Sequence, residues 1–281
     1  MARIDLHLHT TYSDGSVPPA EVVSLAHKAS VTALAITDHD IVDGIPEALE
    51  AGTQLGVEVI PGIEISSRWE EKETHILGYF LKWQDPELQK CLADHRISRH
   101  TRNPQIVEKL NKFGLSLTYD EVKAKGHSAS IGRPHIAQVL VEKGYVNSVK
   151  EAFDRYLGVG GDAYIPRELP EAREAIDWIR KAGGVPVLAH PGWTKQKGED
   201  LKKFCKKLKE AGLLGIEVFY STHHPRQTSE YLGVARHLDL LVTGGSDFHG
   251  VTKPGIEVGI GRGNLKVPEK LLEPLKNAAC F

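Results

Sequence analysis

The residues best suited to chemistry in this 281-residue chain are histidines and acidic residues that recur where predicted strands end. The stretch from Asp5 to His9 alternates polar and apolar residues, which predicts a strand with His7 and His9 on one face. With a strand rise of roughly 3.3 Å per residue, the two imidazoles lie about 7 Å apart and suit one divalent metal ion. Asp14 follows in a turn that Gly15 eases.

Later predicted strands end in similar residues. His39 lies in an Asp-His-Asp sequence, Glu64 follows a Pro-Gly pair, and Asp247-Phe248-His249 repeats the spacing of the first histidines. The complete set is His7, His9, Asp14, His39, Glu64, His75, His190, Asp247 and His249. Six imidazoles and three carboxylates suffice for two or three transition-metal ions if carboxylates bridge them.

Each of these residues also has an ordinary structural explanation. The two histidines of the first strand could hydrogen-bond within the core, the residues around His39 could cap a helix, and Glu64 could lie on the surface. The same arrangement at successive strand ends makes a purely structural explanation of all nine improbable.

Strands alternate with helices through most of the chain. We expect strands over residues 4–9, 32–37, 57–65, 74–80, 185–189, 214–219 and 240–244. This alternation predicts an α/β fold with a mostly parallel sheet, and closure into a barrel would bring the polar strand ends to one face. An open doubly wound sheet is the alternative, but no Gly-x-Gly-x-x-Gly turn follows the first strand.

The middle of the chain breaks this alternation. Residues 85–161 contain several predicted helices and no strong strand, so we expect an inserted helical subdomain that forms a lid over the barrel mouth. The barrel itself would consist of residues 1–84 and 162–281.

Composition narrows the functional classes. With a net charge of -2, the chain has no excess of positive charge with which to bind long duplex nucleic acid. No apolar run reaches membrane-spanning length, so we expect a cytoplasmic protein without a membrane partner. The three scattered cysteines, Cys91, Cys205 and Cys280, are expected to be reduced thiols.

The strand-end motifs resemble those of the polymerase and histidinol phosphatase (PHP) family. The likeness includes Asp5-Leu6-His7-Leu8-His9, Thr37-Asp38-His39, Pro61-Gly62-Ile63-Glu64, His190-Pro191-Gly192 and Gly245-Ser246-Asp247-Phe248-His249. The resemblance implies a distorted (β/α)7 barrel with a trinuclear site for divalent metal ions, manganese first, with iron or zinc as alternatives.

Carried over by position, the resemblance implies three ligand sets. One metal would be held by His7, His9, Glu64 and Asp247. A second would share Glu64 with His75 and His190. The third would take Asp14, His39 and His249; many family members have a histidine where Asp14 stands, which affects the metal preference of this third site.

The inserted segment is similar to that of one PHP subgroup, the 3′,5′-nucleotide bisphosphate phosphatases and related 5′–3′ exoribonucleases. The similarity lies in Arg99-x-x-Arg102-Asn103, Gly132-Arg133-Pro134-His135 and the stretch 156–166. It implies hydrolysis of a nucleoside 3′,5′-bisphosphate such as pAp to AMP, and trimming of short 5′-phosphorylated RNA. Because guanidinium groups bind phosphate bidentately, we assign Arg99, Arg102, Arg133 and His135 to substrate binding; solvated helix faces or surface ion pairs are the alternative.

In this reading a metal-bound hydroxide attacks phosphorus, since clustered metals lower the pKa of bound water to roughly 7. His223 is a candidate to protonate the leaving group, with a surface turn as its alternative. Asp5 and Asp38 are expected to orient the histidines. Lys253 is a candidate phosphate contact or an ordinary loop lysine.

Three other functions compete with this one. A small-metabolite phosphatase such as histidinol-phosphatase would share the metal core. A C–N hydrolase on a similar barrel lacks a clearly placed lysine for a carbamylated bridge. A non-catalytic PHP module should have lost ligands, and none of the nine is missing.

Overall fold

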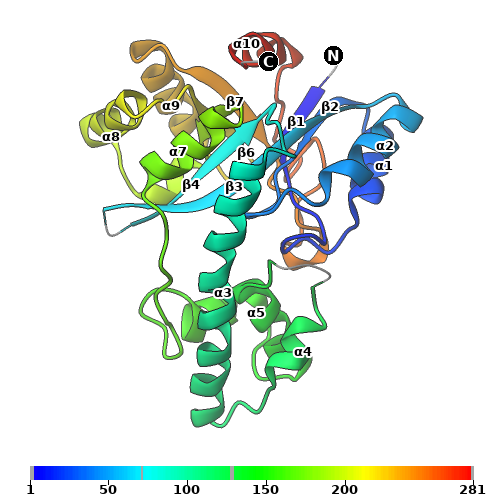
Figure 1. The fold of residues 1–281 in the computed structure, drawn as a ribbon, viewed down its shortest axis with the longest axis vertical. Helices are drawn as coiled ribbons and strands as arrows, with labels where there is room; N and C mark the ends of the chain where they lie inside the picture. Colours follow the sequence, from blue (N-terminus) through cyan, green and yellow to red (C-terminus); the bar gives the residue numbers. More distant parts are fainter. Residues whose placement is uncertain (1–2, 71, 127–129, 280–281) are drawn as a thin grey trace.

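The computed structural model describes residues 3–70, 72–126 and 130–279, and within these ranges a seven-stranded sheet forms the centre of the molecule. Its strands are β1 (Arg3–Leu8), β2 (Val31–Ile36), β3 (Glu58–Trp69), β4 (Lys72–Tyr79), β5 (Val185–Leu188), β6 (Gly215–Tyr220) and β7 (Leu241–Gly245). They follow one another in sequence order. Figure 1 shows the helices arranged around this sheet.

The sheet curls so that its first and last strands meet. Beyond the end of β7, the backbone N–H of Asp247 donates to the carbonyl of His7 at 2.8 Å, and the N–H of His9 donates to the carbonyl of Phe248 at 3.0 Å. These bonds make the sheet a nearly closed barrel, so the predicted (β/α)7 architecture is confirmed.

One strand is antiparallel to its neighbours within the mostly parallel sheet that the sequence predicts. β4 runs antiparallel to both β3 and β5, whereas the other neighbouring pairs are parallel. Only residues 70 and 71 separate β3 from β4, and a parallel connection needs a crossover of a dozen or more residues. The lack of a helix between these two strands therefore explains why they run antiparallel.

Helices cover the barrel on its outside. They are α1 (Pro19–Lys28), α2 (Ile45–Leu55), α7 (Ala172–Lys181), α8 (Gly198–Glu210), α9 (Pro225–His237) and α10 (Leu272–Ala278). Helix α1 begins at Pro19, with Pro18 at its N-cap position. No helix among the described residues is long and apolar enough to cross a membrane.

The segment between β4 and β5 is helical, as expected. It contains α3 (Pro86–Lys112), α4 (Tyr119–Lys123), α5 (Arg133–Glu142), α6 (Val149–Ala152) and a π-helical turn over Phe153–Leu157. In Figure 1 it lies at the end of the barrel opposite α10. Its apolar cluster extends from Ile106 to Ala163, but Leu88 and Leu92 of α3 pack into a barrel cluster. Helix α3 therefore joins the two cores, and the division at residues 84 and 85 stays a prediction.

Two cysteines fall within the described residues. Cys91 and Cys205 are both free, and Cys205 lies in α8 with its side chain buried in the core. Cys280 lies outside the described residues.

Barrel closure predicts a contrast between two glycines. A Cβ at Gly245 would lie inside contact distance of the His7 backbone, whereas a Cβ at Gly233, on the exposed side of α9, meets nothing within 4 Å. We expect Gly245→Ala to lower the free energy of unfolding by about 1–3 kcal/mol or more. Gly233→Ala should raise it by about 0.5–1 kcal/mol. Urea unfolding measures both, and equal effects would contradict this closure geometry.

Candidate metal centre

All nine predicted ligand residues lie in one cluster. Neighbouring imidazole nitrogens and carboxylate oxygens are 2.7–3.9 Å apart. They come from the ends of β1, β2, β5 and β7 and from within β3 and β4, which barrel closure brings together. Most of them are buried, while His39 and His75 are partly exposed.

Glu64 is the centre of the cluster. Its Oε1 lies 2.7 Å from His190 Nε2 and 2.9 Å from His75 Nδ1. Its Oε2 lies 3.2–3.3 Å from nitrogens of His7, His9 and His39. Burial alone would raise the pKa of this carboxyl, but the surrounding histidines hold it well below its usual range. Glu64 is therefore an ionised carboxylate in contact with five imidazoles.

Asp14 and Asp247 flank this centre on opposite sides of His9. Asp14 Oδ1 is 3.3 Å from His249 Nε2 and 3.7 Å from His9 Nδ1. Asp247 Oδ1 is 3.4 Å from His9 Nε2 and 3.3 Å from His249 Nδ1. The histidine and aspartate side chains thus form a continuous array of nitrogen and oxygen donors.

The donor set fits divalent metal ions. His7 Nε2 and His9 Nε2 face each other at 3.2 Å and both face Glu64, and His39 Nδ1 lies 3.2 Å from Glu64 Oε2 without the geometry of a hydrogen bond. Such converging acceptors need cations or protons between them. Four groups have ligand atoms within 4.8 Å of one another: His9, Asp14, His39 and His249; His7, Glu64 and His190; His7, His9 and Asp247; and His39, Glu64 and His75. The partition into three metal sites stays a prediction, because His7, His9, His39 and Glu64 each belong to two of these groups.

Glu217 is a buried residue that the sequence analysis missed. It lies in β6, accepts a hydrogen bond from His7 Nδ1 at 2.9 Å and accepts another from the backbone N–H of His190 at 2.7 Å. With Nδ1 donating to Glu217, His7 keeps Nε2 free for a metal. An acidic residue inside the apolar strand Gly215–Tyr220 was the signal that could have identified it.

Asp5 and Asp38 hold the backbone, which differs from the expectation that they orient imidazole rings. Asp5 accepts hydrogen bonds from the N–H groups of Ser246 and Gly259. Asp38 accepts from the N–H of Thr10 and from the Thr10 and Ser13 hydroxyls. Both therefore act on the segments that carry the ligands. Among the described residues neither carboxylate is hydrogen-bonded directly to a histidine ring, and Asp38 reaches His9 Nδ1 through the Ser13 hydroxyl, which lies 3.4 Å from that nitrogen.

Arg99 does not lie on a solvated helix face. It is buried and donates to Asp40 Oδ2 from Nη2 at 2.5 Å and from Nε at 3.1 Å. Asp40 also contacts Arg167 and His95, both of which the sequence analysis missed. Burial alone would raise the pKa of Asp40, but these three partners hold it well below its usual range. Asp40 therefore ties α3 and residue 167 to the loop that carries His39.

Arg102 is buried in a different environment. Its Nε has no hydrogen-bond partner among the described residues, and its Nη2 donates to the side-chain oxygen of Asn103 at 3.4 Å. Burial, together with Arg133, Arg99 and Arg167, lowers the pKa of its guanidinium. A guanidinium nevertheless stays charged in proteins, so Arg102 is a buried cation that lacks a carboxylate among these residues.

The other two predicted substrate residues lie near the cluster. Arg133 donates to Glu73 at 3.2 Å, and the other Glu73 oxygen is 3.3 Å from His75 Nε2. His135 is buried and accepts a hydrogen bond from the N–H of Gly132. The structure thus places Arg133 one carboxylate away from a candidate metal ligand.

His223 and Lys253 border the same region. His223 is buried rather than in a surface turn; its Nδ1 donates to the carbonyl of Val218, and burial lowers its pKa. Its Nε2 has no partner among the described residues. Lys253 pairs with Asp247, and its Nζ lies 3.2 Å from the Tyr220 hydroxyl. Lys253 is therefore not an isolated loop lysine.

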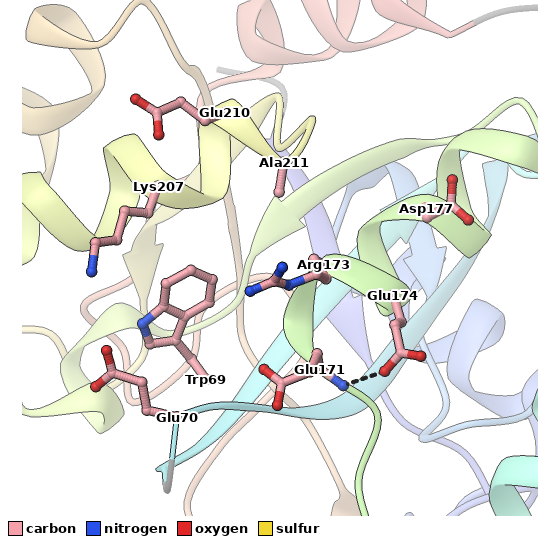
Figure 2. A pocket seen from close by; sticks show the side chains of 9 residues that line it. All are labelled: Trp69, Glu70, Glu171, Arg173, Glu174, Asp177, Lys207, Glu210 and Ala211. Atoms are coloured by element: carbon pink, nitrogen blue, oxygen red, sulfur yellow. Dashed lines mark hydrogen bonds between the residues drawn. The ribbon is translucent and has the colours of Figure 1, made fainter.

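An open pocket lies apart from this centre, between α7, α8 and the end of β3 (Figure 2). Its lining residues are Trp69, Glu70, Glu171, Arg173, Glu174, Asp177, Lys207, Glu210 and Ala211. None of the predicted site residues is among them, and the two cations it contains leave it acidic. The metal centre is thus a separate site.

Comparison with known proteins gives a consistent result. The profile of the PHP domain matches residues 5–184. A 5′-3′ exoribonuclease of Haemophilus influenzae is 36% identical over 88% of this chain and 90% of its own length. A 3′,5′-nucleoside bisphosphate phosphatase of Chromobacterium violaceum is 32% identical over 92% of this chain and 91% of its own. The structure of an amidohydrolase from C. violaceum, with sulfate bound and no metal, superimposes with a TM-score of 0.90 at 30% identity, covering 99% of this chain and 97% of that one.

The buried ion-pair group predicts a large effect of Asp40→Ala. The substitution leaves Arg99, Arg167 and His95 buried without the carboxylate that neutralises them. We expect the free energy of unfolding to fall by about 3–5 kcal/mol. Urea unfolding measures this, with Glu108→Ala as the control, because Glu108 pairs with Lys112 on the surface and should have no measurable effect. Equal stability of the two variants would refute the role of Asp40.

Glu217 provides a prediction about metal affinity. Glu217→Gln keeps the size of the side chain but removes the charge that fixes His7, so we expect metal affinity to fall about 10–100-fold. Titration of metal-free protein with Mn²⁺ measures it. Glu210→Gln, an exposed substitution in α8, is the control. Unchanged affinity in Glu217→Gln would mean that the His7 orientation does not depend on Glu217.

Proposed function

This chain belongs to the PHP domain family and is a metal-dependent phosphoesterase, and we propose that it removes the 3′-phosphate of nucleoside 3′,5′-bisphosphates, converting pAp to AMP. A single feature carries this proposal. Beside the cluster of metal-binding side chains lies a group of buried or half-buried arginines that is in contact with fewer carboxylates than it has positive charges.

The cations of this group are Arg99, Arg102, Arg133 and Arg167, and the carboxylates in contact with them are Asp40 and Glu73. Asp40 engages Arg99 and Arg167, and Glu73 engages Arg133. Arg102 contacts no carboxylate among the described residues. A phosphate carries close to two negative charges and accepts the paired N–H bonds of a guanidinium, so a second phosphate of the substrate would balance this group.

The metal-binding side chains would take the phosphate that reacts. We propose that all nine ligand residues hold two or three divalent ions, with manganese as the first candidate. Bound there, such ions neutralise phosphate oxygens and lower the pKa of water to roughly 7. Water adds to phosphorus, the bond between phosphorus and the 3′-oxygen breaks, and the 3′-oxygen takes up a proton.

The chain's own residues would position the substrate for this step. Arg102 and Arg133 bind the 5′-phosphate. Arg99 is held in position by its ion pair with Asp40, and His135 supports the turn at Gly132. His223 stays a candidate for the proton donor. Its lowered pKa favours the neutral imidazole at pH 7, so it would have to receive a proton before giving one.

The same geometry suits the 5′ end of a short RNA. A 5′-phosphate in the arginine group would place the first 3′-phosphodiester at the metal-binding side chains. Trimming of 5′-phosphorylated RNA is therefore part of the proposal, and two relatives of this chain carry the name 5′-3′ exoribonuclease. We further propose that residues 85–161 act as a lid, because α3 carries Arg99 and Arg102 from the barrel to the inserted segment.

A small-metabolite phosphatase and a non-catalytic module are not favoured. The substrate of histidinol-phosphatase has one phosphate and would leave Arg102 without an anion. A non-catalytic module has no need to keep nine buried donors together.

The proposal predicts that Arg102 acts on substrates with two phosphates. We expect wild-type protein loaded with Mn²⁺ to prefer adenosine 3′,5′-bisphosphate to adenosine 3′-phosphate in kcat/KM. Arg102→Met should lower kcat/KM for the bisphosphate about 10–100-fold, because a charged hydrogen bond contributes roughly 1.5–3 kcal/mol, and should leave the monophosphate unchanged.

Arg155→Met is the matched control for this measurement. Arg155 belongs to the same inserted segment but is exposed and pairs with Glu151. Its substitution should change kcat/KM for neither substrate. If Arg102→Met lowers kcat/KM equally for both substrates, Arg102 does not bind the second phosphate.

A further inference from the structure

Trp193 lies exposed at the edge of the metal centre, although tryptophan is usually buried. It is 56% exposed, and its ring centre is 4.3 Å from that of His190 and 6.2 Å from that of His75. Both histidines are candidate metal ligands that contact Glu64. An indole in this position adds nothing to a hydrophobic core, and it lies beside two candidate metal ligands.

The turn that carries Trp193 is held firmly. Residues Pro191–Thr194 form a 3-10 turn in which the N–H of Trp193 donates to the carbonyl of His190 at 2.9 Å. The N–H of His190 donates to Glu217, and the φ of His190 is +23°, a conformation that L residues rarely adopt. A Cβ on Gly192 would lie 3.1 Å from Gln227 Nε2 and 3.3 Å from the Tyr231 hydroxyl. The indole is thus presented by a backbone that has little freedom to move.

Charge around the indole favours an aromatic ligand that bears phosphate. The ammonium group of Lys253 lies 5.6 Å from the centre of the Trp193 ring and 5.5 Å from that of Tyr220. This cation, which also pairs with Asp247, lies beside the indole, and the indole offers a flat apolar surface. Together they match a group that is aromatic at one end and anionic at the other.

We propose that Trp193 is the stacking platform for the nucleobase of the substrate, and this inference rests on the proposed function. A phosphate held by the side chains around Glu64 has its sugar and base within reach of the ring that packs on His190. Stacking accepts any base, because every base has a π-face. Trp193 therefore selects nucleotides over base-free phosphates without choosing among bases.

The test compares substrates with and without a base. They are adenosine 3′,5′-bisphosphate, cytidine 3′,5′-bisphosphate and the abasic tetrahydrofuran 3,5-bisphosphate, each with Mn²⁺-loaded protein. We expect Trp193→Ala to lower kcat/KM about 5–100-fold for both nucleotides and to leave the abasic compound unchanged. Trp193→Phe should keep most of the wild-type kcat/KM for the nucleotides. Phe113→Ala, an aromatic residue 53% exposed at the end of α3, is the control and should change nothing.

A binding measurement without catalysis completes the test. Titration of the protein with AMP should quench tryptophan fluorescence in the wild type, and Trp193→Phe should abolish most of the quenching. The stacking role is overturned if Trp193→Ala lowers kcat/KM equally for the nucleotide and abasic substrates, or if fluorescence quenching persists in Trp193→Phe. If the wild type hydrolyses no bisphosphate, the proposed function fails, and the AMP titration alone decides whether Trp193 stacks on a base.

Discussion

One buried carboxylate, Glu64, governs the arrangement of this protein. Its two oxygens contact five imidazoles within 3.3 Å, and such a charge is stable inside a protein only when every partner is in place. The partners come from β1, β2, β4 and β5 or the residues that follow them. A nearly closed barrel is the arrangement that delivers these separated segments to one carboxylate, so fold and site depend on each other.

A second buried carboxylate, Asp40, links the barrel to the inserted segment. It lies one residue beyond His39 and gathers His95, Arg99 and Arg167. Arg99 and Arg167 are therefore tied to the loop that carries His39, while Arg133 is tied to β4 through Glu73. These connections would let a mostly separate apolar cluster in residues 106–163 contribute to the proposed substrate recognition.

The sequence predicted the parts of the site that local periodicity controls. His7 and His9 share a face because strand side chains alternate, and strand ends meet because βα units form parallel sheets. Other features depend on contacts between distant residues. Glu217 meets His7 across 210 positions and Arg167 meets Asp40 across 127, and no local pattern identifies such partners. Trp193 was missed because an aromatic residue in sequence is ordinarily assigned to a core, and only its exposure beside His190 distinguishes it.

The central claim is that the 3′-phosphate is the one removed, and the identity of the product tests it most directly. Phosphorus NMR would follow adenosine 3′,5′-bisphosphate with manganese-loaded protein, with histidinol phosphate and a short 5′-phosphorylated RNA in parallel samples. We predict equal amounts of inorganic phosphate and adenosine 5′-phosphate, together with 5′-nucleotides from the RNA. Formation of adenosine 3′-phosphate, or turnover of histidinol phosphate alone, would contradict this account of the site.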